Sequence, residues 1–458
     1  MKISSEFINK YNKPGPRYTS YPPATFFHEN FVIQEVKNKI LLSNSQQPEN
    51  ISIYIHIPFC PKQCSFCGCT TVIGKGKSVI LQYVEALISE IKQVSEYIDK
   101  SRKVSQIHWG GGTPNSIPLE YIGQIMTCIK EIFSFTDNAE VAIECSPAYL
   151  KLTDIPVYAA MGFNRMSLGI QDFDDKVLSL VNREKSKYPV DKIVATLREN
   201  NFKGINLDLI YGLPGQTPES FIESVKKAVE INPDRIVTFS YAHVPWVKEF
   251  QKRLEEVGLP SPDQKMLMLT GSLELLTNSG YVQIGMDHYA KEDDDISIAL
   301  KNKKLHRNFQ GYCTLETTGQ VYGFGASSIT QLQGAYIQNT KNLSEYVDSV
   351  NRSGFAVEKV YFLSQADEIR RKVINEVMCN NYLDLDEITK LFAISLEELK
   401  SVLGFEISKF DEFVEDNLLK ITGNVFEISE KGRLIVRNIA MKFDPTLKEG
   451  AQVYSKTV

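Results

Sequence analysis

Residues 51–69 read ISIYIHIPFCPKQCSFCGC, and this stretch decides the fold. Its first seven residues are mostly apolar and rich in isoleucine, which predicts a buried β-strand. Four cysteines follow within ten residues, at Cys60, Cys64, Cys67 and Cys69, in the spacing C-x3-C-x2-C-x-C. A cysteine cluster directly after a strand places several thiols at the carboxyl end of a sheet, where α/β barrels carry their functional groups.

Five more strand-like segments follow along the chain. They are SQIHWGG (105–111), EVAIEC (140–145), RMSLGIQ (165–171), INLDLIYG (205–212) and RIVTFSYAH (235–243). Segments with helical spacing lie between them, at 80–94, 118–133 and 218–230. Strands that alternate with helices form parallel βαβ units. The pattern therefore predicts an α/β protein whose residues 51–360 form a partial six-stranded (β/α) barrel with an extension.

Each of the six strands ends on polar or glycine residues. These strand-end residues are His56, Gly110, Gly111, Gly112, Thr113, Glu144, Gln171, Asp208, Tyr241, Ala242 and His243. One polar residue at a strand end is commonplace, because many loops begin with one. Six such ends in succession predict that one face of the barrel carries a site.

Two further parts flank the predicted barrel. Residues 1–50 are expected to form an irregular N-terminal arm, because PGPRYTSYPP at 14–23 contains residues that break regular structure. Residues 361–458 predict a mainly helical, winged-helix-like C-terminal domain with short helices and a hairpin at 421–429. This domain has 13 basic and 17 acidic residues, so we expect a structural or covering role for it and not duplex binding.

Composition narrows the function classes. The 458 residues include 51 basic and 56 acidic side chains, a net charge of −5, so the chain lacks a global basic footprint for nucleic acid. Its apolar stretches are too short for a membrane span, and its first residues lack the apolar region of a secretory signal. We therefore expect a cytoplasmic protein. In that setting a tight cysteine cluster indicates metal binding or catalysis and not disulfides.

The cysteine spacing leaves three kinds of site open. Three thiolates on one loop can hold three irons of a cubic [4Fe–4S] cluster, which leaves the fourth iron open to a non-protein ligand. A structural zinc site normally uses two separated pairs of ligands. A ferredoxin-type cluster with four protein ligands usually has C-x2-C-x2-C or C-x4-C-x2-C spacing. The observed spacing favours the cluster with an open iron.

The motif YIHIPFC with this spacing resembles the radical S-adenosylmethionine (SAM) superfamily, and HWGGGTP (108–114) is similar to its glycine-rich cofactor motif. Motifs from about residue 14 to the C-terminus resemble, within that superfamily, the oxygen-independent coproporphyrinogen III oxidase family. They are PRYTSYPP (16–23), CGC (67–69), IQDF (170–173), VNRE (181–184), NLDLIYGLPGQTPESF (206–221), HRNFQGY (306–312) and RNIAMKFD (437–444). One departure is Ser146, where the family usually has Asp.

The resemblance implies an activity. The family converts two propionate side chains of coproporphyrinogen III into vinyl groups and gives protoporphyrinogen IX in haem biosynthesis, after a 5′-deoxyadenosyl radical abstracts a hydrogen atom. The implied cofactors are one [4Fe–4S] cluster with an open iron and two SAM molecules. By position, Cys60, Cys64 and Cys67 match the cluster ligands, and Cys69 matches an extra cysteine that acts in the reaction or supports the loop.

The resemblance also implies two groups of SAM-binding residues. Those around the first molecule are Tyr54, Gly111, Glu144 and Ile329. Those around the second are Phe66, Gly112, Thr113, Gln171, Arg183, Asp208 and Ala242. We further expect a flavodoxin- or ferredoxin-type reductant and a monomeric chain.

The substrate of that family carries four carboxylates, so cationic contacts are expected. Arg17, Arg165 and Arg307 are candidates, because guanidinium groups bind carboxylates with two hydrogen bonds. Each of them alternatively forms a structural ion pair, and this reading is the stronger one for Arg165. Two other functions stay open: a haem-binding chaperone of the same superfamily, which generally lacks the CGC ending and the PRYTSYP arm, and an electron-transfer or structural iron–sulfur protein.

Overall fold

A central run of six parallel strands organises the chain. In the computed structural model, which describes residues 5–314 and 320–447, these strands are neighbours in sequence order. They are β1 (Ile51–Ile57), β4 (Val104–Gly111), β5 (Phe135–Cys145), β6 (Arg165–Gln171), β7 (Gly204–Tyr211) and β8 (Arg235–Ser240). Every neighbouring pair is parallel. The predicted α/β class and its six strands are confirmed.

Shorter strands extend this sheet at both ends. Beside β1 lie β13 (Val321–Phe324), β14 (Ile329–Gln331), β15 (Ala335–Asn339) and β16 (Val357–Phe362), and beside β8 lie β10 (His288–Lys291) and β9 (Tyr281–Gln283). Only β13 among these is parallel to its neighbour β1. Since β16 and β9 end the strand order, the barrel is partial and open, as predicted.

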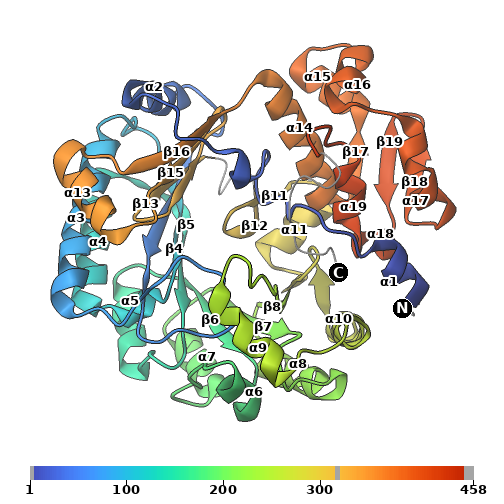
Figure 1. Cartoon of the computed structure of the whole chain (residues 1–458). Helices are drawn as coiled ribbons and strands as arrows, with labels where there is room; N and C mark the ends of the chain where they lie inside the picture. The colour runs from blue at the N-terminus through green and yellow to red at the C-terminus, as the bar shows by residue number, and fades with distance from the viewer. Residues whose placement is uncertain (1–4, 315–319, 448–458) are drawn as a thin grey trace.

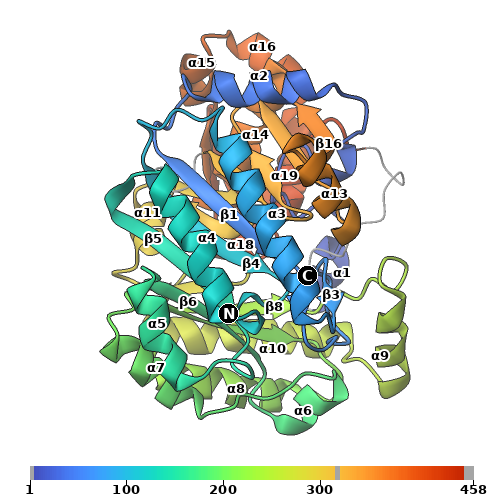
Figure 2. The same ribbon diagram turned by 90° about the vertical axis from the view of Figure 1, so that its left-hand side faces the viewer.

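Helices cover the outer side of the curved sheet. Figure 1 shows α3, α4, α5, α7 and α8 along this side, and Figure 2 shows α3 and α4 in front of β1 and β4. Their bounds are α3 (Lys77–Ser95), α4 (Leu119–Ile132), α5 (Ile155–Ala160), α6 (Asp175–Leu180), α7 (Val190–Glu199), α8 (Pro218–Ile231), α9 (Lys252–Val257), α10 (Pro262–Asn278), α11 (Asp295–Lys301) and α13 (Leu343–Ser353). In α3 the buried Ile80, Val84, Leu87 and Ile91 recur every three or four residues and form one apolar stripe.

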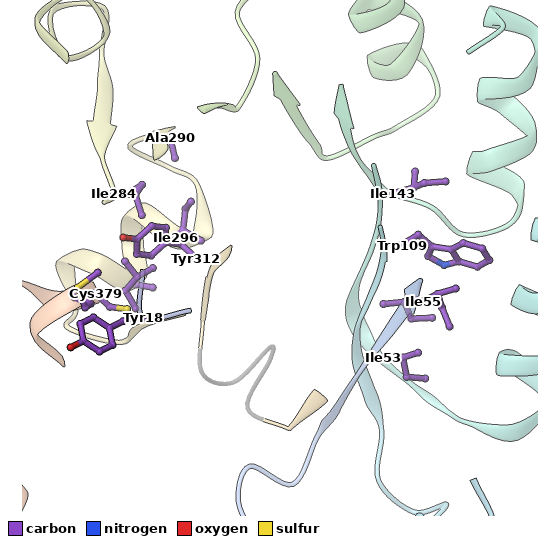
Figure 3. Close-up of a cluster of buried hydrophobic side chains, with 14 of the residues drawn as sticks. Tyr18, Ile53, Ile55, Trp109, Ile143, Ile284, Ala290, Ile296, Tyr312 and Cys379 are labelled. Carbon is purple, nitrogen blue, oxygen red and sulfur yellow. The ribbon is translucent and has the colours of Figure 1, made fainter. Parts of the chain in front are cut away.

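The apolar core fills the space between the sheet and these helices. Ile53, Ile55, Trp109 and Ile143 are all at most 1% exposed and come from three neighbouring strands. Figure 3 shows these four side chains on the same side of the sheet. Because this face is packed against helices, the opposite face of the strands remains for the site.

The N-terminal arm is more ordered than predicted. It contains α1 (Ser5–Tyr11) and α2 (Ile33–Ser43), so the prediction of irregular structure is wrong for these segments. In α2 only Val36, Ile40 and Ser43 are buried, and so narrow an apolar stripe is hard to recognise in a polar segment. Tertiary contacts fix α1, where Tyr11 donates a hydrogen bond to Asp416 Oδ2 at 2.6 Å. Residues 14–23 contain neither a helix nor an extended strand, as predicted.

The C-terminal region combines short helices with a small sheet. Its elements are α14 (Gln365–Asn375), a π-helical turn (Glu376–Asn380), β17 (Tyr382–Asp384), α15 (Leu385–Phe392), α16 (Leu396–Leu403), α17 (Asp411–Glu415), β18 (Leu419–Thr422), β19 (Val425–Ile428), α18 (Glu430–Arg433) and α19 (Val436–Met441). The predicted hairpin is β18–β19, and β17 joins it as a third strand. Phe410 packs on Phe443 at 4.9 Å and on Phe426 at 5.3 Å between ring centroids, which gives the region its own aromatic core.

The three-part division at residues 50 and 360 stays a prediction.

Of the helices in the described ranges, none is both long and apolar enough to cross a membrane.

Candidate active site

The inner face of the barrel contains a cavity of about 540 Å³. All six parallel strands or the loops directly after them contribute lining residues. Gly111, Glu144, Gln171 and Asp208 come from β4, β5, β6 and β7, and Ser240 ends β8. The loop that follows β1 closes the cavity with its cysteines. The strand-end residues therefore meet, because parallel strands point their carboxyl ends to one edge.

Most of the residues expected to form a site line this cavity. They are Cys60, Cys64, Phe66, Cys67, Cys69, Gly111, Gly112, Thr113, Glu144, Gln171, Arg183, Asp208 and Ala242. Tyr54 and Ile329 are not among the lining residues. Tyr54 lies on β1 and its ring stacks on His108, with centroids 6.0 Å apart. Ile329 lies two strands away on β14, next to Gly323, the register partner of Tyr54.

Hydrogen bonds from distant segments hold the cysteine loop against the barrel. Asn182 Nδ2 donates to the Gln63 carbonyl at 2.7 Å, and the amide of Ser65 donates to the Val181 carbonyl at 2.9 Å. From the loop after β8, Lys248 Nζ donates to the Cys69 carbonyl at 2.9 Å. The loop is therefore attached to both sides of the cavity opening and its thiols are kept at the strand ends.

Two thiols of this loop contact side chains of the cavity. Cys60 Sγ lies 3.3 Å from Thr113 Oγ1, and Cys64 Sγ lies 3.6 Å from Arg183 Nη1. Burial raises the pKa of both thiols, and Arg183 opposes this effect because its positive charge favours the thiolates. A metal bound here would take the place of the thiol protons, because a coordinating thiol is deprotonated.

The three thiols expected as ligands fit a polynuclear cluster. Cys60, Cys64 and Cys67 are partly buried, and none of them is in a disulfide. Within residues 5–314 and 320–447, no three His, Cys, Asp or Glu side chains converge as ligands of a single metal ion. A cubic iron–sulfur cluster does not need such convergence, because each thiolate binds a different iron. Soft thiolate ligands are the donors that Fe–S clusters take.

Acidic residues face the thiols from β5 and β7. Glu144 Oε1 lies 3.0 Å from His108 Nε2, and a Cβ atom on Gly110 would come within 3.0 Å of the Glu144 carboxylate. Asp208 accepts hydrogen bonds from Ser167 and Asn206, each at 2.7 Å. Burial nevertheless raises the pKa of Asp208 to about 6. Both carboxylates suit the hydroxyl or ammonium groups of a polar ligand.

Two further cavity residues carry polar atoms without partners. Gln171 has φ +71°, a strained conformation for a non-glycine residue, and its Oε1 is buried. Arg183 Nη2 donates to the Gly169 carbonyl at 2.6 Å, but its Nε is buried as well. Neither Gln171 Oε1 nor Arg183 Nε has a hydrogen-bond partner in the part of the chain that the structure describes. Buried groups of this kind cost about 1–3 kcal/mol each and are typical of ligand sites.

The three candidate arginines differ in their positions and contacts. Arg165 Nε donates to Glu140 Oε2 at 2.6 Å. Arg165 therefore forms a structural ion pair, which was the alternative to binding a substrate carboxylate. Burial acts to raise the pKa of Glu140, but the charges of Arg165 and Arg235 and the hydrogen bond from Gln106 together outweigh it and lower this pKa to about 2. Arg17 lines the cavity and Arg307 does not.

Sequence reasoning missed several polar residues of the cavity wall. They are Gln106, Glu140, Ser167, Asn206, Arg235, His288, Asn308, Gln310 and Tyr312. A usable signal was present, because polar residues occupy every second position of β6 and β7, at Arg165, Ser167, Asn206 and Asp208. Alternate residues of a strand share one face, so this period identifies the inner wall.

Comparisons with known proteins agree over the whole chain. A family model described as the Radical SAM superfamily matches residues 54–228. The chain is 40% identical to "Oxygen-independent coproporphyrinogen III oxidase" of Synechocystis sp., over 100% of this chain and 98% of that protein. The identically named Escherichia coli protein is 40% identical over 97% of this chain and 96% of its own length.

A solved structure is similar to this chain in fold as well as in sequence. It is the coproporphyrinogen III oxidase of Escherichia coli, described as a radical SAM enzyme. Its fold matches with a TM-score of 0.88 at 39% identity, and the match covers 94% of this chain and 98% of that chain. The chain therefore belongs to the oxygen-independent coproporphyrinogen III oxidase family of the radical SAM superfamily.

Proposed function

We propose that the chain converts two propionate side chains of coproporphyrinogen III into vinyl groups without oxygen and so forms protoporphyrinogen IX for haem biosynthesis. Each conversion removes one hydrogen atom, one electron and one molecule of carbon dioxide from a propionate. The full-length similarity to enzymes named for this substrate carries the proposal. The cavity behind the cysteine loop supports it, because six strand ends and the thiols meet there.

Membership of the radical SAM superfamily implies a [4Fe–4S] cluster and SAM. We assign Cys60, Cys64 and Cys67 as the cluster ligands, which leaves one iron open to SAM. When bound, these groups supply a carbon radical able to take an unactivated hydrogen atom. Cys69 lies on the same loop, is exposed and lines the cavity, which supports a role in the reaction or in shaping the loop.

Two SAM molecules are assigned to two parts of the site. Tyr54, Gly111, Glu144 and Ile329 would hold the first molecule. Phe66, Gly112, Thr113, Gln171, Arg183, Asp208 and Ala242 would hold the second. The unpartnered Gln171 Oε1 and Arg183 Nε support the second group, because a ligand with ammonium and carboxylate groups supplies both missing partners.

The remaining assignments concern the setting of the reaction. A flavodoxin- or ferredoxin-type protein is proposed as the reductant, and the chain is proposed to act as a monomer in the cytoplasm. None of the eight cysteines, all of which lie in the described ranges, is in a disulfide, which fits a reducing compartment. The CGC ending and the PRYTSYPP segment favour the enzyme over a haem-binding chaperone.

The deciding experiment is anaerobic reconstitution with iron and sulfide, followed by incubation with SAM, a reductant and coproporphyrinogen III. Mass spectrometry of the oxidised porphyrins should show loss of two carboxyl groups, together with 5′-deoxyadenosine. Tight haem binding without porphyrin turnover would instead identify a chaperone and contradict the proposal.

A further inference from the structure

Two buried arginines from distant parts of the chain hold the backbone of the N-terminal arm. Arg307, on β11 (Leu305–Asn308), donates from Nη1 to the Arg17 carbonyl at 2.9 Å. Arg437, on α19, donates from Nε to the Pro16 carbonyl at 3.1 Å and from Nη2 to the Gly15 carbonyl. These bonds fix the main chain of the arm where it passes the cavity, and they do not involve the Arg17 side chain.

The turn after Arg17 is fixed as well. Tyr18 has φ +49°, which costs about 1–3 kcal/mol for a residue other than glycine. Its phenol donates to Asp444 Oδ2 at 3.0 Å, and the residue is only 6% exposed, so packing maintains the turn. Figure 3 shows Tyr18 in the same group of buried side chains as Tyr312, a cavity-lining residue of β12 (Gly311–Thr314).

The Arg17 side chain is consequently presented at the cavity with the Asp287 carboxylate as a neighbouring charge but without a direct ion pair among the described residues. It is exposed and lines the cavity wall. Among the residues that the structure describes, no carboxylate forms an ion pair with it. Arg165 differs in this respect, because Glu140 at 2.6 Å and Asp294 at 3.9 Å compensate its charge.

The surroundings of Arg17 favour an anion. Burial lowers the pKa of Arg437 to about 9, and the positive charges of Arg17 and Arg307 add to this effect. The carboxylate that faces these arginines is Asp287, and its Oδ1 already lies 2.7 Å from His288 Nδ1. Guanidinium groups held together in this way are stabilised by an anionic ligand.

Asn308 adds a hydrogen-bond donor to the same cavity. This residue is 1% exposed and lines the cavity, and its Nδ2 has no partner in the described ranges. Its Oδ1 accepts from the amide of Gln310 at 2.9 Å, which orients the side-chain amide. A buried donor left unpaired is costly unless a ligand supplies the acceptor.

We propose that Arg17, assisted by Asn308, binds a propionate carboxylate of the tetrapyrrole substrate that does not react. This assignment rests on the proposed function. The substrate carries four propionates and loses two, so a retained carboxylate can anchor the macrocycle during both conversions. An ion pair to a reacting carboxylate would oppose catalysis, because it stabilises a charge that disappears as carbon dioxide leaves.

Binding of coproporphyrin III to the reconstituted enzyme tests this assignment. Fluorescence titration under anaerobic conditions gives the Kd for the unmodified chain, Arg17→Ala, Arg17→Gln and Arg17→Lys. The control is Arg352→Ala, on the exposed surface of α13. We expect Arg17→Ala and Arg17→Gln to weaken binding at least 10-fold at low salt, with a smaller salt dependence than the unmodified chain. Arg17→Lys should recover part of the loss, and Arg352→Ala should change Kd less than 2-fold.

Iron content and thermal unfolding of each variant establish that its fold and cluster are retained. Retention is expected, since the Arg17 carbonyl and not its side chain makes the structural contact. If Arg17→Ala and Arg17→Gln bind within 2-fold of the unmodified chain, the carboxylate site is refuted while the proposed function stands. If the unmodified chain neither binds coproporphyrin III nor converts coproporphyrinogen III, the proposed function fails, and this inference fails with it.

Discussion

Substituting Gly112 with Ala tests whether the glycine-rich turn must touch the cysteine loop. A Cβ atom at Gly112 would lie 2.7 Å from the Pro58 carbonyl oxygen and 2.8 Å from the Phe59 carbonyl oxygen. Both obstacles are backbone atoms, so no side chain can swing away to make room. The turn would have to separate from the loop, and the hydrogen bond from the Thr113 amide to the Phe59 carbonyl, 2.9 Å long, would be lost or lengthened.

The size of the effect follows from these contacts. Overpacking a close contact costs about 1–3 kcal/mol, and a lost backbone hydrogen bond costs about 0.5–1.5 kcal/mol. We therefore expect Gly112→Ala to lower the free energy of unfolding by about 1.5–4.5 kcal/mol. The same movement displaces Thr113 from Cys60 Sγ, so iron content and SAM cleavage should fall as well.

The matched control is Gly76→Ala, at the residue before α3. A Cβ atom there meets nothing within 4 Å, and because Gly76 is the N-cap of α3, where glycine is preferred to alanine, we expect a loss of at most about 1 kcal/mol. Chemical denaturation of the cluster-free proteins measures stability, and iron analysis with 5′-deoxyadenosine formation measures the site. Equal stability, iron content and cleavage in Gly112→Ala and the unmodified chain would show that the close approach is not required.

Four further substitutions test other parts of the site and the core. Cys64→Ala should abolish the visible absorbance of the cluster and all turnover, whereas Cys69→Ala should retain nearly all the iron. Loss of a quarter or more of the iron from Cys69→Ala would refute its assignment as a non-ligand. Arg183→Ala should reduce the SAM stoichiometry measured by equilibrium binding from two toward one, because the guanidinium with its unpartnered Nε is lost; an unchanged stoichiometry of two would count against that assignment. Burial raises the pKa of Glu90 from 4.5 to about 7. Between these pH values the folded state therefore holds a proton that the unfolded state has lost. The free energy of unfolding should consequently fall as pH rises through this range, by at most about 3 kcal/mol. Urea denaturation at pH 5 and pH 8 should show this fall, Glu90→Gln should largely remove it, and an identical fall in Glu90→Gln would assign it to another group.

Much of the barrel could be predicted from local pattern. The strand predicted at 165–171 coincides with β6, and the helices over 80–94, 118–133 and 218–230 correspond to α3, α4 and α8. These elements carry strong apolar periodicity because one face of each is buried in the core. The helix α2 escaped prediction because only three of its residues are buried. The strand β17 escaped because three residues are too few to show a period.

Part of the candidate site could likewise be predicted from the sequence, and part could not. Cysteine spacing and strand-end residues are local features, and they identified most of the candidate residues that line the cavity, whereas Phe66 and Arg183 came from the family resemblance. The polar residues of the inner wall, from Gln106 to Arg235, could not be assigned in this way. Whether they line the cavity depends on which face of each strand points away from the helices. The ion pair of Arg165 with Glu140 depends on the register of β6 against β5.

The sequence alone indicated the succession of the strands and the cysteine loop proposed to bind the cluster, because hydrophobic period and cysteine spacing act over short distances along the chain. Its motifs, taken together, indicated the family. Only the tertiary structure decided which arginine lacks a direct ion pair within the described residues. Arg17 and Arg165 are equivalent as side chains, yet one is placed beside Glu140 and the other is held at the cavity by Arg307 and Arg437. The charge that an arginine offers to a ligand depends on the neighbours that folding brings to it, and these lie 25 residues away for Arg165 and several hundred residues away for the arm that carries Arg17.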